Sequence, residues 1–101
     1  MSGLSRRQME ITNTLGLHLR AASQFVQLSR QFRAEVRVFC NGRAADGGSI
    51  LELMTLAAGC GASLELEVNG PEAEEAIAAL FELIECRFHE DEEGRDERPG
   101  S

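Results

Sequence analysis

One histidine stands directly before a stretch of helical periodicity, in the run Gly-Leu-His-Leu-Arg at residues 16–20. Histidine changes charge near neutral pH, and one of its two ring nitrogens can keep a lone pair for nucleophilic attack. The first N–H groups of a helix have no acceptor inside the helix and therefore attract anions. His18 is thus a candidate phosphoryl acceptor; the alternative is a turn or capping histidine without chemistry.

Arg20 follows two residues later and supplies a fixed positive charge. Its planar guanidinium can bind two phosphate oxygens at once, whereas the ammonium of a lysine acts as a point charge. Arg20 is therefore a candidate for stabilising a phosphoryl group on His18. If His18 carries no phosphoryl group, Arg20 is an ordinary solvated helix residue.

A second motif begins at Ser49, which is followed three residues later by Glu52 and then by an apolar run. This spacing is typical of a capping box, in which the serine hydroxyl accepts from the third helical amide and the glutamate reaches back to the serine amide. The motif predicts that a helix begins here. Capping alone accounts for the serine, and regulatory phosphorylation is the alternative, because it would add negative charge at the helix N-terminus.

Charge and length restrict the class of protein. The chain has 101 residues and a net charge of −7, and residues 90–98 hold six acidic and two basic residues. Nucleic-acid-binding domains normally carry a basic stripe, so this balance argues against that class. No apolar run approaches the roughly 20 residues that cross a bilayer. We expect one soluble domain, with a flexible N-terminus at residues 1–7 and a disordered acidic tail at 90–101.

The cysteines and the second histidine give no candidate site. Cys40, Cys60 and Cys86 are widely spaced and form no Cys/His cluster for a metal. We expect them to be small buried residues with free thiols, in keeping with a reducing cytoplasm. No cofactor is expected, and His89 is assigned no role.

Hydrophobic periodicity predicts the elements that position the motifs. Apolar and polar residues alternate in three segments, which we expect to be strands: residues 8–13, 34–40 and 62–69. A further, short strand is expected at residues 43–45, returning from a turn. Asn41-Gly42 predicts a hairpin turn between the second and third strands. Helices are expected at residues 19–32, from Ser49 to about residue 59, and from Pro71 as the first helical position to Ile84.

These elements predict an α+β fold. Each strand is apolar on one face, so we expect a two-layer open-faced sandwich: a four-stranded, mostly antiparallel sheet with three helices on one face. The second helix is apolar nearly all round, so some of its side chains must face outwards. We assign Leu53 and Leu56 to the core and Leu51 and Met54 to an exposed patch.

Together the two motifs resemble the histidine-containing phosphocarrier (HPr) family of the bacterial phosphoenolpyruvate-dependent phosphotransferase system. Residues 15–22 are similar to the family's Gly-Leu-His-x-Arg-Pro-Ala segment, and residues 48–57 to the segment around its regulatory serine. The likeness runs from about residue 9 to residue 84 and includes the element order β-α-β-β-α-β-α. Ala21 stands where the family usually has proline, and Gly48 where many members have a basic residue.

The resemblance implies a phosphocarrier domain at residues 8–89. His18 would accept a phosphoryl group from enzyme I, as a tele-phosphohistidine on Nε2, and pass it to an enzyme IIA-type acceptor. Arg20 and the backbone amides of Leu19 and Arg20 would bind the phosphoryl oxygens. Onward transfer would serve either sugar uptake or a regulatory branch.

The resemblance also implies partners and a location. Ile50, Leu51 and Met54 would dock partner proteins, and an HPr kinase/phosphorylase would act on Ser49. The protein would be a cytoplasmic monomer and a carrier rather than an enzyme. The alternative is a regulatory module on the same fold that docks partners without carrying phosphate. A small-molecule enzyme is disfavoured, because no second catalytic group lies near His18 in the sequence.

Overall fold

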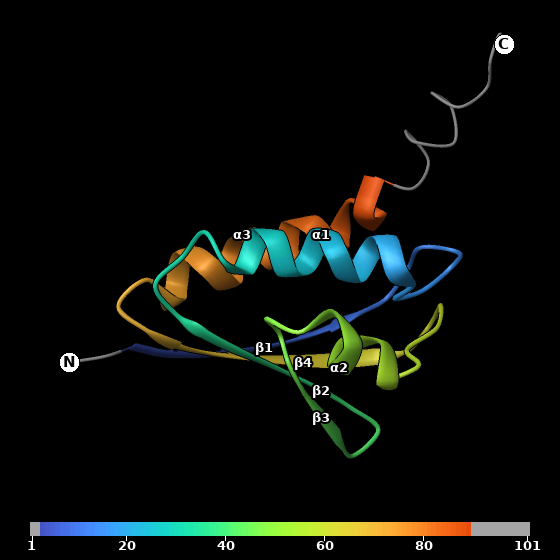
Figure 1. Ribbon diagram of the computed structural model, residues 1–101, viewed down its shortest axis with the longest axis horizontal. Helices are drawn as coiled ribbons and strands as arrows, with labels where there is room; N and C mark the ends of the chain where they lie inside the picture. Colours follow the sequence, from blue (N-terminus) through green and yellow to red (C-terminus); the bar gives the residue numbers. More distant parts are fainter. Residues whose placement is uncertain (1–2, 90–101) are drawn as a thin grey trace, which may run out of the picture.

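Three helices pack on one face of an antiparallel sheet (Figure 1). The computed structural model describes residues 3–89. Its elements are β1 (Gly3–Glu10), α1 (Leu19–Ser29), β2 (Glu35–Cys40), β3 (Arg43–Asp46), α2 (Ile50–Thr55), β4 (Ser63–Gly70), α3 (Ala73–Glu85) and a short 3₁₀ turn, η1 (Arg87–His89). The strand order is β1-β4-β2-β3, with every neighbouring pair antiparallel. The expected two-layer α+β sandwich is confirmed.

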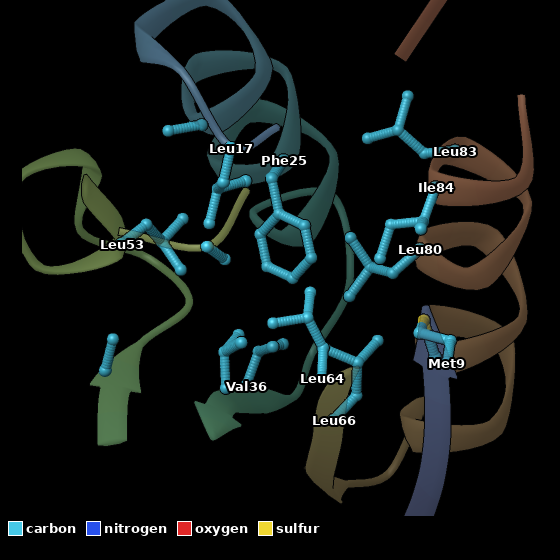
Figure 2. Packing of buried hydrophobic residues seen from close by; sticks show 14 of the residues in the cluster. Met9, Leu17, Phe25, Val36, Leu53, Leu64, Leu66, Leu80, Leu83 and Ile84 are labelled. Atoms are coloured by element: carbon cyan, nitrogen blue, oxygen red, sulfur yellow. The ribbon is translucent and has the colours of Figure 1, made fainter. Parts of the chain in front are cut away.

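The core lies between the sheet and the helices. Figure 2 shows Phe25 of α1 above Leu64 of β4, with Leu80 of α3 beside them, and each of these side chains is at most 1% exposed. Val36 and Val38 of β2 face the same layer because alternate strand residues share a face. Among residues 3–89, no helix combines the length and the apolar character needed to cross a membrane.

β1 begins earlier than the alternation predicted. Gly3 already pairs with Gly70 of β4, so the expectation of a flexible segment at residues 1–7 is wrong for residues 3–7; residues 1–2 lie outside the described part. The apolar pattern missed this half of the strand because Arg7 occupies a helix-facing position. Its guanidinium lies 3.7 Å from the ring centre of Phe81 in α3. A cation–π contact here takes the place of aliphatic packing.

The hairpin between β2 and β3 forms as the sequence predicted. Asn41 and Gly42 have φ values of 55° and 80°, and positive φ at both central residues is the requirement of a type I′ turn. β3 is one of the two edge strands and extends one residue past the expected end, to Asp46. The chain leaves the hairpin at Gly47, two residues before Ser49.

α1 and α2 are both shorter than the periodicity predicted. α1 ends at Ser29 rather than residue 32, and α2 ends at Thr55, followed by Ala57 with φ 51°. Phe32 and Leu56 still pack on the core beyond the helix ends. The apolar pattern therefore continues after the helical hydrogen bonds have stopped, and periodicity overestimates the helix length.

α3 begins at Ala73, so the expectation of Pro71 as its first residue is wrong. Glu72 is the N-cap residue: its carboxylate accepts from the Arg33 amide at 2.7 Å, and its own amide donates to the Arg33 carbonyl at 3.2 Å. This exchange with the loop before β2 holds the chain outside the helix for two residues after Gly70. At the other end, Phe88 of η1 is only 1% exposed and extends the core past the predicted helix.

The three cysteines differ in their exposure to solvent. Cys40 is buried, as expected, but Cys60 and Cys86 are exposed, so the expectation that all three are core residues is wrong for those two. Cys60 lies in the loop after α2, and Cys86 is the C-cap residue of α3; neither position faces the helix–sheet interface. The acidic tail at 90–101 lies outside the described residues.

Candidate functional site

A closely held turn leads from β1 to α1 and carries the candidate histidine. Gly16 has φ +69°, and a Cβ atom there would lie 2.5 Å from the carbonyl oxygen of Ala58. Only glycine can place the turn this close to the segment that follows α2. Next to it, Leu17 is 6% exposed, and its amide donates to the Ala58 carbonyl at 2.8 Å. Core packing and these contacts therefore fix the residue immediately before His18.

His18 is the N-cap residue of α1, where the sequence placed it. Its backbone is extended, and its carbonyl accepts the first helical hydrogen bond, from the Ala22 amide at 2.8 Å. The amides of Leu19 and Arg20 precede that bond, so the helix geometry directs them outwards from its start. The His18 side chain does not cap the helix.

The two nitrogens of the imidazole do not share the same surroundings. The ring as a whole is half-buried, and its Nε2 atom is buried. The resemblance to the phosphocarriers implied phosphorylation on Nε2, and this geometry does not fit that assignment, because a donor protein cannot reach a buried atom. Nδ1 is the remaining candidate.

The first turn of α1 keeps its expected place despite Ala21. Alanine is the best helix former, and both Ala21 and Ala22 are fully buried against the core. α1 accordingly starts at Leu19, as predicted. Arg20 is exposed on this same first turn, two residues after His18.

Ser49 is the N-cap residue of α2, and its hydroxyl accepts from the Glu52 amide at 3.2 Å. The second half of the expected capping box is wrong. The Glu52 carboxylate accepts from the Asp46 amide at 2.8 Å, while the Ser49 amide donates to the Asp46 carbonyl at 3.1 Å. Because the turn from β3 already satisfies the Ser49 amide, Glu52 binds the end of β3 instead.

Exposed apolar side chains lie on both elements of the site. We call the following four residues the apolar surface: Leu15 (65% exposed), Leu19 (61%), Leu51 (79%) and Met54 (38%). The predicted division of α2 is confirmed, since Leu53 is fully buried and Leu56 is 4% exposed. Ile50, which the resemblance implies as a docking residue, is half-buried and packs against the core.

Sequence reasoning missed Leu15 and Leu19 as members of this surface. The available signal was two leucines flanking the candidate histidine, outside the apolar stripe of α1. Contact between α1 and α2, together with the Leu17–Ala58 hydrogen bond, brings the turn and α2 into one region of the molecule.

Comparison with known proteins identifies the family to which this chain belongs. The family model described as the PTS HPr component phosphorylation site matches residues 5–86. The chain belongs to the HPr family. It is therefore a phosphocarrier protein of the phosphotransferase system.

Relatives of this HPr-family chain are similar over nearly their whole length. Phosphocarrier protein HPr of Cupriavidus necator is 45% identical over 87 residues, which cover 86% of this chain and 98% of that protein. Phosphocarrier protein NPr of Escherichia coli K12 is 38% identical over 87 residues, covering 85% and 97%. The crystal structure of HPr from Thermoanaerobacter tengcongensis superposes with a TM-score of 0.80 at 36% identity, covering 83% of this chain and 94% of that one.

Proposed function

We propose that His18 is the residue of this phosphocarrier that takes up the phosphoryl group and passes it on. The observation that carries the proposal is its place as N-cap residue of α1, where the first helical amides and the Arg20 side chain share one turn with the ring. Phosphoryl transfer depends mainly on positioning and on stabilising charge on the phosphoryl oxygens. The start of α1 provides both.

The accepting atom in this proposal is Nδ1. In a neutral imidazole one nitrogen carries the proton and the other the lone pair. Because Nε2 is buried, the proposed nucleophile is the lone pair of Nδ1, and the reacting tautomer is the one with its proton on Nε2. Nδ1 attacks the phosphorus, an N–P bond forms, and the bond between the phosphorus and the donor breaks. The phosphoryl oxygens then accept hydrogen bonds from the amides of Leu19 and Arg20 and from the Arg20 guanidinium.

The partners in this proposal are enzyme I as donor and an enzyme IIA-type protein as acceptor, both meeting the carrier in the cytoplasm. Exposed apolar side chains gathered in one region are typical of protein interfaces. The apolar surface, with the adjoining edge of Ile50, supports docking beside His18. A single surface serves both partners in turn, whether the acceptor belongs to sugar uptake or to a regulatory branch.

The test is incubation with enzyme I and phosphoenolpyruvate, followed by phosphorus and ring-nitrogen NMR. We expect one acid-labile, base-stable phosphoryl group on Nδ1, none in His18→Ala, and transfer from the wild type to an acceptor protein. His18→Ala should keep its fold, because the His18 side chain does not cap α1.

Each part of the proposal has its own contrary result. Equal labelling of His18→Ala would refute the role of His18. A phosphoryl group on Nε2 would refute only the choice of nitrogen. Binding to a partner without any phosphoryl transfer would indicate a regulatory docking module instead.

A further inference from the structure

Asn13 lies at the start of the turn before His18, and its side chain has no part in the phosphoryl chemistry above. It is fully buried. Its Nδ2 atom donates to the carbonyl oxygen of Gly16 at 2.8 Å, and the same oxygen accepts from the His18 amide at 2.9 Å. One carbonyl oxygen thus joins the Asn13 side chain to the backbone of the phosphoryl acceptor.

This link completes the restraints on the peptide between Gly16 and Leu17, whose amide donates to the Ala58 carbonyl at 2.8 Å. The hydrogen bond from His18 to Gly16 spans only two residues, and Gly16 itself adopts a left-handed conformation that few residues share. The Gly16 amide donates back to the Asn13 carbonyl at 3.3 Å, a long hydrogen bond. Without the Nδ2 bond, the carbonyl end of the Gly16–Leu17 peptide would keep only the short-range bond from the His18 amide. A tilt of this carbonyl would then shift the backbone that carries the His18 ring.

The other half of the Asn13 amide shows that stability alone does not favour asparagine here. Its Oδ1 atom is buried and has no hydrogen-bond partner within residues 3–89. An unsatisfied buried acceptor lowers the free energy of unfolding, because the acceptor has lost its water without gaining a donor. Such costs persist mainly where the group serves a function.

We propose that Asn13 is a positioning residue for phosphoryl transfer: its Nδ2 hydrogen bond fixes the Gly16 peptide and thereby orients the His18 ring. The inference rests on the proposed role of His18. Because Asn13 is fully buried, it cannot touch a partner protein. It therefore acts on the rate of transfer and not on the affinity for enzyme I.

The decisive variant is Asn13→Asp, which keeps the shape of the side chain and replaces the donor facing Gly16 with an acceptor. The matched control is Ser29→Ala at the opposite end of α1. It removes a buried hydroxyl that donates to the carbonyls of Val26 (3.0 Å) and Gly47 (3.2 Å), and it leaves the turn intact. Both variants lose buried hydrogen bonds, and only the first loses the link to His18.

The measurement is kcat and KM for phosphorylation by enzyme I and phosphoenolpyruvate, with the melting temperature and the exchange rate of the His18 amide proton. For Asn13→Asp we expect kcat to fall roughly tenfold to a hundredfold, as for a displacement of about 1 Å at a reacting group, while KM stays within about twofold. The His18 amide should exchange faster. Ser29→Ala should keep the wild-type kcat and His18 exchange rate.

A wild-type kcat in Asn13→Asp overturns the inference, and so does an effect on KM alone or an equal fall in Ser29→Ala. If Asn13→Asp does not fold, Asn13→Ala is measured by the same criteria, since it also removes the unsatisfied Oδ1 acceptor. Labelling of His18→Ala tests the proposed function separately. Normal transfer in the Asn13 variants with an inactive His18→Ala would refute only the positioning role.

Discussion

At the scale of single residues, backbone groups supply most of the proposed phosphoryl site. In this proposal the amides of Leu19 and Arg20 are direct donors, and the Gly16 carbonyl accepts from the His18 amide at 2.9 Å. Side-chain identity matters chiefly at His18 as nucleophile and at Arg20 as the charged donor. The burial of Nε2 matters as much to the proposal as the presence of the ring, because it leaves Nδ1 as the proposed accepting atom.

Arg20→Ala should slow phosphoryl transfer by roughly tenfold, less than the loss of a donor in a closed active site, because Arg20 is exposed. Arg20→Lys should recover part of the rate, since lysine keeps the charge and lacks the planar fork. Single-turnover rates measure both. The control is Arg37→Ala in β2, which removes the same charge from an exposed strand position; an equal fall there would show that net charge, not place, matters.

At the scale of elements, α2 is a short helix fixed at its start. Ser49 caps it, and Glu52 ties it to the end of β3 through the Asp46 amide. A helix of six residues has little stability of its own, so these contacts and the buried Leu53 hold it in place. Its exposed side then presents Leu51 and Met54 at a fixed position.

Ser49→Asp should raise the KM for enzyme I by roughly threefold to tenfold, because it adds negative charge at the edge of the docking region. Aspartate caps a helix as well as serine does, so the melting temperature should change little. Ser49→Asn, a cap without charge, is the control and should behave like the wild type. Unchanged kinetics in Ser49→Asp would leave only the capping role and would argue against regulation by an HPr kinase/phosphorylase.

At the scale of the whole molecule, the fold joins two segments that are far apart in the sequence. The turn before α1 and the loop after α2 meet through the hydrogen bond from Leu17 to Ala58, so His18 and α2 share one region. Figure 1 shows that β1 starts at the opposite end of the molecule from the start of α1. Exposed apolar residues at the start of β1 therefore lie at the opposite end of the molecule from His18.

Leu51→Ser should raise the KM for enzyme I severalfold and leave kcat and the melting temperature unchanged, because Leu51 is 79% exposed and lies on the apolar surface. Leu4→Ser is the matched control: Leu4 is 59% exposed on β1, at the other end of the molecule. Steady-state phosphorylation by enzyme I measures both variants. An equal effect of the two would mean that docking does not depend on the apolar surface.

Prediction from sequence succeeded where the signal is local and failed where distant residues decide. Alternation located three strands, and the Asn41-Gly42 turn signal located β3. Alternation missed the first half of β1, because Arg7 packs on Phe81 of α3. The start of α3 was misplaced because Glu72 bonds to Arg33, 39 residues away in the chain. Helix ends were misplaced because packing continues beyond them at Phe32 and Leu56.

The sequence by itself determined the parts of the site that depend on neighbouring residues: His18 at the start of α1, Arg20 on its first turn, and Ser49 as the cap of α2. These follow from spacing and helix geometry alone. Only the tertiary structure decided that Nε2 is buried, that Asn13 holds the Gly16 peptide, and that Leu15 and Leu19 join α2 in one apolar surface. Burial depends on which distant segments pack together, and a pattern of neighbouring residues in the sequence does not specify those contacts.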